Sequence, residues 1–592
     1  YMETKEQYKD CILFYRLGDF YEMFFDDAIV ASKELEIALT GKSCGLEERA
    51  PMCGIPYHAV ETYLARLVSR GYKVAICEQV EDPKLAKGLV KREVIRVVTP
   101  GTNLDVQSLE ASKNNYLMCI AYTSDGIGIS AADVTTGDYY VTEVEDLRKL
   151  KDELMKYEPS EIICNEAFLV SGYDVEDLKS RLHMSVSSLE SHMFDDDGCR
   201  RILMRHFKVN TLIGLGVEEF PTGILAAGAL LQYLYDTQKT DLEHFTHISP
   251  YLTSKYMLLD SSTRRNLELT ETLREKQKRG SLLWVLDKTK TAMGGRLLRN
   301  YIEQPLIDKE EMEKRLDAIQ ELNQDSISRD EIREYLNPVY DLERLLSKVT
   351  YKTANPRDLI AFRNSLQMLP PIKTVLAGFQ KEELAAIREE IDGLEDIYQL
   401  IDEAIVEEPP ISIREGGMIK DQFDETIDHL RAAKHDGKQW LVQLEEEDRE
   451  RTGIKNLKIK KNNVFGYFFE VTNSYKDLVP EDYIRKQTLA NAERYTTPRL
   501  KELEDTILNA EDKLQTLEYD IFCRIRDTIA QELVRIQNTA KALAKLDVYA
   551  SLSLVSERNH YVRPKLNEKG VIDIKDGRHP VVEQMITNDM FI

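Results

Sequence analysis

The sequence lacks features that several large classes of protein require. No run of about 18 apolar residues occurs, so no segment is long enough to span a membrane as a helix. The eight cysteines are scattered and form no CxxC pair, which argues against a zinc ribbon and a thioredoxin-like site and fits a reducing cytosol. No HExxH or similar metal-binding spacing is present. We therefore expect no metal site and no membrane partner.

Catalytic patterns are equally scarce. The ten histidines are isolated, and no nucleophile can be paired with a base. Gly41-Lys42-Ser43 resembles the end of a phosphate-binding P-loop, but Glu36 stands where the motif needs its first glycine. The residues between them belong to a predicted helix, Ala28 to Leu39, and are not glycine-rich. The residues alone thus predict no catalytic group and no phosphate-cradling loop.

Positive charge is also in short supply, because the formal net charge is −24. That average argues against a nucleic-acid partner. One stretch is an exception: residues 451–500 contain ten Lys and Arg against five Asp and Glu, a local balance of +5. A phosphate backbone needs only a local basic surface. Composition leaves DNA binding and an ordinary solvated face equally open here.

Hydrophobic periodicity divides the chain into a mixed α/β part and a helical part. Residues 1 to about 103 show short strands and helices, and residues 113 to 245 suggest a sheet covered by helices, starting with a hairpin at Asp125-Gly126. The chain after about 250 is mostly helical. Predicted strands are 12–16, 74–77, 94–98, 116–122, 127–134, 138–144 and 161–164, and predicted helices in the first part are 28–39 and 60–69.

A long helical arm is predicted in the last third of the chain. From Leu500 to Ile521 apolar residues alternate spacings of three and four, and residues 499–563 contain no proline, so one uninterrupted helix is possible. A second helix is marked by apolar residues from Phe423 to Leu444. Between them, residues 452–498 are β-prone and carry most of the positive stretch. We call residues 452–498 the basic tip, and its place at the end of an arm favours binding to a DNA backbone.

The aromatic segment Phe20-Tyr21-Glu22 follows a turn at Gly18-Asp19. Most such segments are core, but strand alternation puts Phe20 and Glu22 on one face and Tyr21 on the other. A ring beside a carboxylate on one surface is unusual for a core. It could act as a wedge between base steps, with the carboxyl group contacting a base edge. On the residues alone the core interpretation is the commoner one.

Several blocks in fixed order resemble the MutS family of mismatch repair proteins over nearly the whole chain. Residues 14–24, 54–59, 75–79 and 98–102 are similar to the family's mismatch-binding domain, and residues 260–268 and 291–298 to its core. The blocks read FYRLGDFYEMF, GIPYHA, AICEQ, VTPGT, DSSTRRNLE and TAMGGRLL, followed by NAERY at 491–495 in the clamp and GRHPVVE at 577–583 before the ATPase domain.

This resemblance implies a multidomain α+β fold. The expected parts are a mixed α/β mismatch-binding domain, an RNase H-like α/β connector, an all-helical core with long lever helices, and a small strand-rich clamp at the tip of the arm. Their expected bounds are 1–103 for the mismatch-binding domain, 104–245 for the connector, 246–410 and 521–560 for the core and lever helices, 411–520 for the clamp with its arm helices, and 561–592 for the start of an ATPase domain.

The resemblance also implies a function: recognition of mispaired or unpaired bases, including small insertion or deletion loops, in duplex DNA. Phe20 would stack on the mispaired base and Glu22 would hydrogen-bond to it. Candidate contacts to the DNA backbone are Lys455, Lys458, Lys460, Lys461, Arg485, Lys486 and Arg494. Family members are homodimers, signal to MutL and use ATP with Mg²⁺, and the expected location is the bacterial cytoplasm, associated with the nucleoid.

One departure from the family pattern is expected to matter. The chain stops at Ile592, before the Walker A loop that follows the GRHP block in the family, so we expect a truncated fragment that is not an enzyme and holds no cofactor. Phe591 stands where the family places an aromatic contact to adenine. Two alternatives remain: a structural scaffold whose arm binds protein, and a recombination-type paralogue. The intact Phe20-x-Glu22 argues against the second.

Overall fold

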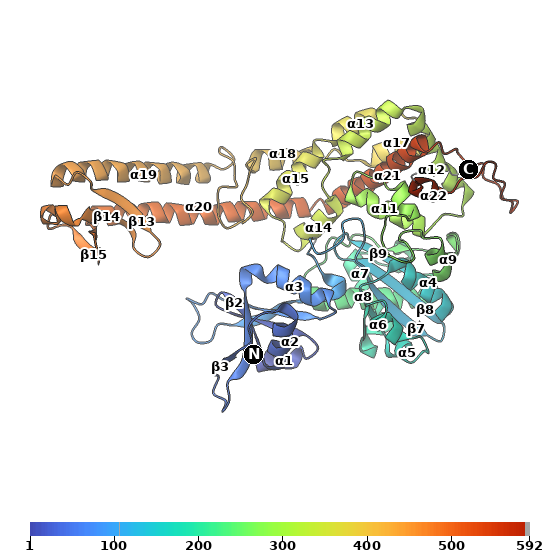
Figure 1. The fold of residues 1–592 in the computed structure, drawn as a ribbon, viewed down its shortest axis with the longest axis horizontal. Coiled ribbons are helices and arrows are strands. Elements are labelled where there is room, and N and C mark those ends of the chain that lie inside the picture. The colour runs from blue at the N-terminus through green and yellow to red at the C-terminus, as the bar shows by residue number, and fades with distance from the viewer. Residues whose placement is uncertain (106, 587–592) are drawn as a thin grey trace. The chain divides into compact units, whose positions relative to one another are not determined.

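The computed structural model of the chain describes residues 1–105 and 107–586 (Figure 1). The chain divides into two compact units. The first unit holds Tyr1–Thr353, Ser365–Leu394 and Glu532–Ile592, and the second holds Ala354–Asn364 and Glu395–Gln531. Sheets occupy the N-terminal parts and helices form the core, which confirms the predicted fold class. Among the described residues, no helix combines the length and apolar character needed to cross a membrane.

The N-terminal part of the first unit is a mixed sheet with α2 and α3 packed on one face and a smaller apolar cluster on the other. The strands run in the order β3-β4-β2-β1-β5-β6, with β1 and β5 parallel and the other neighbours antiparallel. Alternate side chains of the strands form a core with α2 and α3. The elements are α1 Met2–Gln7, β1 Ile12–Leu17, β2 Phe20–Phe24, α2 Phe25–Leu35, β3 Thr40–Lys42, β4 Ala50–Pro56, α3 Val60–Ser69, β5 Val74–Gln79 and β6 Arg92–Val98.

Helix α2 is shorter than its apolar spacing predicts. It ends at Leu35 because Glu36 adopts the left-handed conformation, with φ 56°, and Ile37 donates its N–H to the Ser32 carbonyl at 3.1 Å. This is a common helix-ending geometry, in which the residue after the left-handed one packs back on the core. Ile37 therefore keeps the apolar period without being helical. The predicted helix through Leu39 was wrong, and Gly41 and Lys42 lie in strand β3.

The next part of the first unit is a second sheet with helices on both faces. Its strands run β11-β10-β7-β8-β9-β12. Helices α7 and α8 pack on one face and α4 to α6 on the other, which gives two separate cores. The elements are β7 Leu117–Thr123, β8 Gly126–Asp133, β9 Asp138–Val144, α4 Leu147–Tyr157, β10 Glu161–Cys164, α5 Glu166–Leu169, α6 Val175–Ser180, β11 Ser185–Ser188, α7 Asp196–Phe207, α8 Pro221–Gln238 and β12 Ser249–Pro250.

The rest of the first unit is helical and is built around α21, Leu533–Arg558. Most of the residues of α21 from Leu533 to Val555 are buried, and α11, α12, α13, α14 and α17 all contact it. The other elements are α9 Ser261–Asn266, α10 Leu282–Leu286, α11 Ala292–Glu303, α12 Lys309–Gln324, α13 Ser326–Leu336, α14 Leu342–Thr350, α16 Leu369–Leu376, α17 Glu382–Glu390 and α22 Val582–Met585.

The second unit consists of a helical arm and a small sheet. Helices α19 and α20 lie side by side, and the sheet, in the order β13-β14-β16-β15, is inserted between them in the sequence (Figure 1). Leu500, Ile507 and Leu514 of the predicted seam are buried. The elements are α15 Pro356–Leu366, α18 Glu395–Ala404, α19 Glu425–Thr452, β13 Lys458–Asn462, β14 Gly466–Thr472, β15 Ile484–Thr488, β16 Ala492–Thr496 and α20 Pro498–Ala530.

The proline-free stretch 499–563 is not one helix. Helix α20 ends at Ala530 and α21 begins at Leu533, with Glu532 at φ −107° and ψ 22° outside helical geometry. No proline or glycine marks the break. A missing proline permits a long helix but does not require one, because tertiary packing supplies most of the stability of a helix in a protein. The uninterrupted helix that this stretch allows is therefore broken at Gln531 and Glu532, between two long helices.

Candidate nucleic-acid interface

Strand β2 presents Phe20 and Glu22 on one face and buries Tyr21 on the other. The turn before it uses Gly18 at φ 62°, a conformation that glycine adopts without strain. The register then places Leu17 of β1 opposite Phe20. Phe20 is 47% exposed, whereas Tyr21 is buried. The predicted alternation along this segment is confirmed.

The buried face of β2 fixes the strand that carries Phe20. Tyr21 and Met23 belong to the core formed with α2 and α3. The Tyr21 hydroxyl donates to the carboxylate of Glu78 on β5, and Arg16 donates to the same carboxylate at 3.0 Å. Phe20 is therefore an exposed ring on a strand whose next residue is anchored by packing and by a charged hydrogen bond.

Two neighbours of Phe20 were not found by sequence reasoning. Tyr57, which follows β4, donates its N–H to the Asp19 carbonyl at 2.9 Å and is 42% exposed. The Arg16 guanidinium lies 3.8 Å from the centroid of the Tyr57 ring. These residues put a second exposed ring and a cation at the same end of the sheet as Phe20. The only sequence signal for Tyr57 was its membership of the block at residues 54–59.

Glu22 has a partner that the sequence did not reveal. Lys42 on β3 donates from Nζ to Glu22 Oε2 at 2.7 Å. Strand β4 lies between these two strands, and its Met52 is in register with both Phe24 of β2 and Thr40 of β3. The Lys42 ammonium also lies 5.6 Å from the centroid of the Phe24 ring. The segment Gly41-Lys42-Ser43, which resembles a phosphate loop in letters only, thus supplies the counterion of Glu22.

The basic tip folds as the small sheet of the second unit around an apolar core. Phe469, Tyr483 and Tyr495 pack there, with Phe469 and Tyr483 stacked at 5.0 Å between ring centroids. The candidate cations lie on or beside the strands. Lys455, Lys458, Lys460, Lys461 and Arg485 are exposed, while Lys486 and Arg494 are partly buried.

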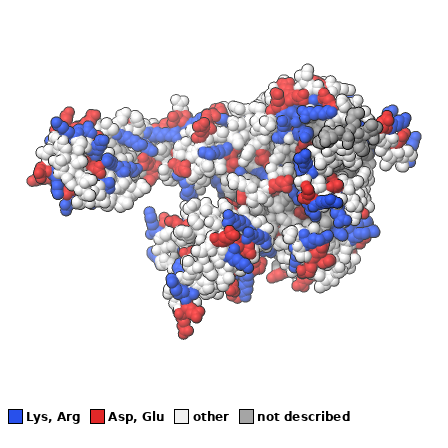
Figure 2. All heavy atoms as spheres, viewed as in Figure 1, with Lys and Arg blue, Asp and Glu red and all other residues white. Residues whose placement is uncertain are grey.

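Acidic side chains neutralise much of the positive charge that the sequence places in the basic tip. Lys460 pairs with Glu470 at 2.5 Å across β13 and β14, and Arg494 lies 3.8 Å from the same carboxylate. Arg485 lies 3.8 Å from Glu493. Figure 2 shows Lys and Arg interspersed with Asp and Glu in this part of the chain. Further contacts are Lys461 to Glu511 at 3.9 Å and Lys486 Nζ to the Phe465 carbonyl at 3.0 Å.

Lys455 and Lys458 differ from the other candidates. Both are exposed, and neither makes an ion pair or a side-chain hydrogen bond within the described part of the chain. An ammonium without a protein partner can approach a phosphate without first breaking a contact. Of the seven candidate backbone contacts, these two lysines have the geometry best suited to that role.

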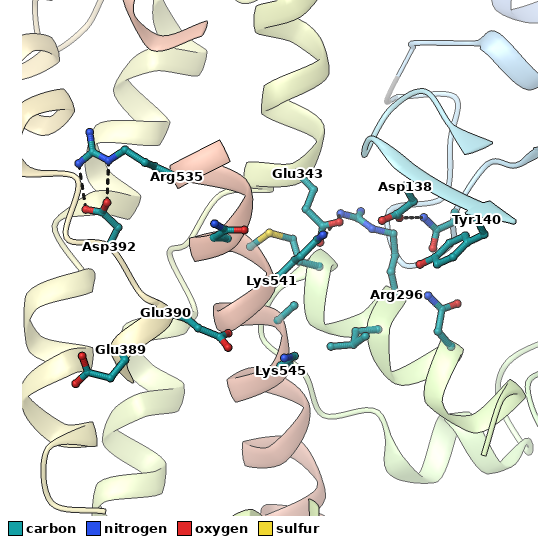
Figure 3. Close-up of a pocket in the computed structure, with 16 residues that line it drawn as sticks. Asp138, Tyr140, Arg296, Glu343, Glu389, Glu390, Asp392, Arg535, Lys541 and Lys545 are labelled. Atoms are coloured by element: carbon teal, nitrogen blue, oxygen red, sulfur yellow. Dashed lines mark hydrogen bonds and ion pairs between the residues drawn. The ribbon is translucent and has the colours of Figure 1, made fainter. Parts of the chain in front are cut away.

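A cavity of about 760 Å³ lies inside the first unit (Figure 3). Arg296 is held by Asp341 at 2.7 Å and Arg535 by Asp392 at 2.8 Å, so two of its cations already have partners. Acidic and basic groups are nearly equal in number around it, which favours no ligand charge. The charged lining residues are Asp138, Arg296, Glu343, Glu389, Glu390, Asp392, Arg535, Lys541 and Lys545.

Two remaining expectations concern metals and nucleotides. Among residues 1–105 and 107–586, no three His, Cys, Asp or Glu side chains are grouped so that they could hold a metal ion. Phe591, the predicted adenine contact, lies outside the described residues.

Comparison with known families gives three matches in chain order. The models for MutS domain I, MutS domain II and MutS domain III match residues 1–107, 115–248 and 262–553. Phe20 and Glu22 lie in the first of these matches, and the basic tip lies in the third.

Curated proteins similar to this chain carry the name DNA mismatch repair protein MutS. The protein from Lachnoclostridium phytofermentans is 66% identical over 100% of this chain and 64% of its own length. Those from Ruminiclostridium cellulolyticum and Acetivibrio thermocellus are 53% and 52% identical over 100% of this chain, each over 68% of its own length. The chain therefore spans about two thirds of the length of these relatives.

Proposed function

The chain belongs to the MutS family of DNA mismatch repair proteins, and from this premise we propose that it binds duplex DNA at mispaired or unpaired bases. The observation that carries the proposal is the exposed Phe20 ring beside Glu22 on a strand whose intervening residue, Tyr21, is buried and anchored. A rigidly supported ring with a carboxylate on the same face is suited to reading a disturbed base step.

Phe20 acts as the wedge. An apolar ring that enters a base step unstacks it and kinks the duplex, at a cost of a few kcal/mol per step. That cost is smallest where the bases are mispaired, because pairing and stacking are already weakened. Since Tyr21 and Met23 hold β2 in place, the ring cannot retreat into the domain when it meets a well-stacked duplex. Discrimination then comes from the DNA's resistance to insertion.

Glu22 reads the base that the wedge displaces. A carboxylate accepts hydrogen bonds from base N–H groups, and those on the Watson–Crick edge are free only where the pairing partner is missing or misplaced.

The experiment compares Phe20→Ala with Trp440→Ala. Trp440 on α19 is 48% exposed, close to the 47% of Phe20, so it controls for the loss of an exposed aromatic. Binding is measured by fluorescence anisotropy on a duplex with one mismatch and on its matched counterpart. We expect Phe20→Ala to abolish the mismatch preference by weakening binding to the mismatched duplex about tenfold or more. Affinity for the matched duplex should stay nearly unchanged. Equal loss on both duplexes would contradict the wedge role.

The basic tip supplies sequence-independent affinity in this proposal. Lys455 and Lys458 contact backbone phosphates directly, while Lys460, Lys461, Arg485, Lys486 and Arg494 contribute only where phosphates compete with their present partners. Backbone contacts position a protein on the duplex and carry no sequence information. Selectivity and affinity would thus depend on different residues.

For the full-length protein we propose the wider role implied by the family. A region beyond residue 592 would bind ATP with Mg²⁺ and couple its hydrolysis to mismatch binding. The protein would work as a homodimer, signal to MutL, and act on nucleoid DNA in the bacterial cytoplasm. ATP-dependent release from mismatched DNA by the full-length protein, set against the behaviour of residues 1–592 alone, tests this coupling.

A further inference from the structure

The Glu22 carboxylate is already occupied in the free protein. Lys42 Nζ lies 2.7 Å from Glu22 Oε2, and among the described residues Lys42 is the cation paired with Glu22. The two residues come from strands separated by β4, so the fold of the sheet brings them together. The proposed function places Glu22 against a base and gives Lys42 no role.

The two partners of this pair are unequal in accessibility. The Glu22 side chain is 16% exposed and the Lys42 side chain is 42% exposed. Glu22 lies on a strand whose opposite face is packed into the core, whereas Lys42 is in the short edge strand β3 and has a flexible four-carbon stem. When a ligand approaches this face of the sheet, the Lys42 ammonium can turn away while the Glu22 carboxylate stays in place.

We propose that Lys42 belongs to the DNA-binding site, where it shields Glu22 from DNA phosphates and releases it only to a mispaired base. The inference rests on the proposed function. On matched duplex no Watson–Crick edge is free to bind Glu22, so the ion pair stays closed and the neutral pair adds little repulsion. On mismatched duplex the base takes the place of the ammonium at Glu22, and Lys42 turns to a backbone phosphate.

The proposal predicts that the effect of changing Lys42 on DNA binding depends on the charge of Glu22. Without Lys42, the Glu22 carboxylate faces the phosphates uncompensated, and binding to both matched and mismatched duplex weakens. If Glu22 is already neutral, loss of Lys42 removes only its own phosphate contact. The effect of changing Lys42 should therefore be much larger when Glu22 is present than when it is Gln.

A double-mutant cycle with Lys42→Met and Glu22→Gln tests this dependence. Dissociation constants for matched and mismatched duplexes are measured for the wild-type protein, both single variants and the double variant at several salt concentrations. We expect Lys42→Met to weaken binding about tenfold at low salt in the wild-type background and about twofold in the Glu22→Gln background. The difference should shrink as salt rises, because screening weakens the repulsion.

Two further variants separate this role from folding. Lys42→Arg keeps a cation that can pair with a carboxylate and should retain near wild-type binding. Arg70 and Glu34 form an ion pair in the same domain at 2.6 Å, with similar exposures of 52% and 24%. The matched cycle of Arg70→Met with Glu34→Gln should leave the affinity for DNA unchanged. A loss of affinity in that cycle as large as at Lys42 would overturn the proposal, since any broken pair would then suffice.

The outcomes distinguish this inference from the proposed function. If the wild-type protein shows no preference for mismatched duplex, the proposed function itself fails. If the preference is present but Lys42→Met has equal effects in both backgrounds, Lys42 contacts DNA independently of Glu22 and only this inference is overturned. An absence of any effect of Lys42→Met in either background also overturns it.

Discussion

Consecutive residues on β2 have different roles because a strand turns successive side chains to opposite faces. Tyr21 is buried and hydrogen-bonded to Glu78, so it supports the strand, while the exposed Phe20 and the partly exposed Glu22 face away from the core. In the proposed function only the outward residues touch DNA. The same division explains why Lys42 and Tyr57, which lie next to the outward residues, are the additions that the structure makes to this site.

A second residue-scale feature is the buried carboxyl group of Glu343 at the cavity in the first unit. Burial is the main cause that raises the pKa of Glu343 from 4.5 to about 8, with Asp138 and Asp341 adding to it and Arg296 opposing it. The Glu343 side chain is 15% exposed and lies 3.8 Å from Arg296. The folded protein therefore keeps a proton on Glu343 over a pH range in which the unfolded chain has lost it.

This difference predicts that Glu343→Gln stabilises the first unit at alkaline pH. Between pH 4.5 and pH 8 the folded state binds one proton more than the unfolded state at Glu343, so its contribution to stability falls as pH rises. The fall is at most about 1.4 kcal/mol per pH unit. Glutamine stays neutral at every pH. The free energy of unfolding of the variant, relative to that of the wild type, should therefore increase from pH 5 to pH 8, as measured by urea unfolding at each pH.

Glu389→Gln is the control for this prediction. Glu389 lines the same cavity, but its side chain is 77% exposed and pairs with Arg388. Because its side chain is exposed, Glu389→Gln should change the free energy of unfolding at pH 8 by no more than about 0.5 kcal/mol. A pH-independent difference for Glu343→Gln would show that Glu343 is ionised in the folded protein.

At the scale of elements, the approach of α11 to α21 depends on one glycine. A Cβ on Gly294 would lie 2.3 Å from Asp547 Oδ2, a distance that no real contact allows. Asp547 cannot move away easily, because it accepts hydrogen bonds from the backbone N–H of Lys290 and from both the N–H and the hydroxyl of Thr291. Burial is also the main cause that raises the pKa of Asp547 to about 6, so the group sits in the centre of the packing.

Gly294→Ala is therefore expected to destabilise the first unit by about 1–3 kcal/mol, the range typical of overpacking. The adjacent Gly295→Ala is a matched control, because a Cβ there would have its nearest neighbour, Ser112 Cβ, at 3.5 Å. Gly295→Ala should be neutral or slightly stabilising, since alanine favours helix by up to about 1 kcal/mol over glycine. Chemical unfolding of both variants tests this, and an unchanged stability of Gly294→Ala would mean that the helices can move apart.

The sheet of the basic tip shows how strand pairing alters a charge count. The sequence gives +5 over residues 451–500, but the antiparallel sheet brings both Lys460 and Arg494 to the carboxylate of Glu470. Cross-strand partners of opposite charge stabilise the sheet and reduce the charge available to DNA. The number of lysines that can release counterions is therefore smaller than the number in the sequence.

At the scale of the whole molecule, the proposed selectivity and affinity belong to different compact units. Phe20, Glu22 and Lys42 lie in the first unit, and the basic tip lies in the second. Each unit has its own core, so a change in one is expected to leave the fold of the other intact. Binding measurements on variants of either unit should thus report on separate contributions.

For the second unit we predict a change in the salt dependence of DNA binding. Lys455→Met combined with Lys458→Met should weaken binding to matched and mismatched duplex alike and reduce the slope of log K against log salt by about two, because each lost phosphate contact removes about 0.9. Lys460→Met should have a smaller effect, since Lys460 is paired with Glu470. Lys309→Met, an exposed lysine at the start of α12, serves as the control.

An unchanged salt slope in the Lys455 and Lys458 double variant would show that the basic tip does not face the backbone. A loss confined to mismatched duplex would place these lysines at the lesion instead. Either result would leave the wedge role of Phe20 untouched, because that role is measured by the ratio of the two affinities.

The sequence by itself determined the local pattern of this protein. Periods of two and 3.6 residues follow from covalent geometry, so α3, β9 and β10 have the bounds that their residues predict. The same alternation placed Phe20 and Glu22 on one face. The ordered family blocks also led to the MutS family without any knowledge of contacts, since they depend only on residue identity and order.

The tertiary structure alone decided which side chains meet. The pairing of Lys42 with Glu22, the packing of Gly294 on Asp547 and the neutralisation of Lys460 by Glu470 all join residues from different elements. Tertiary packing also decided two helix boundaries. Helix α2 ends at Leu35 although the apolar pattern continues, and the chain breaks before α21 although no proline is present. Ion pairs and close contacts depend on strand order, register and burial, which arise from long-range packing and cannot be read from spacing along the chain.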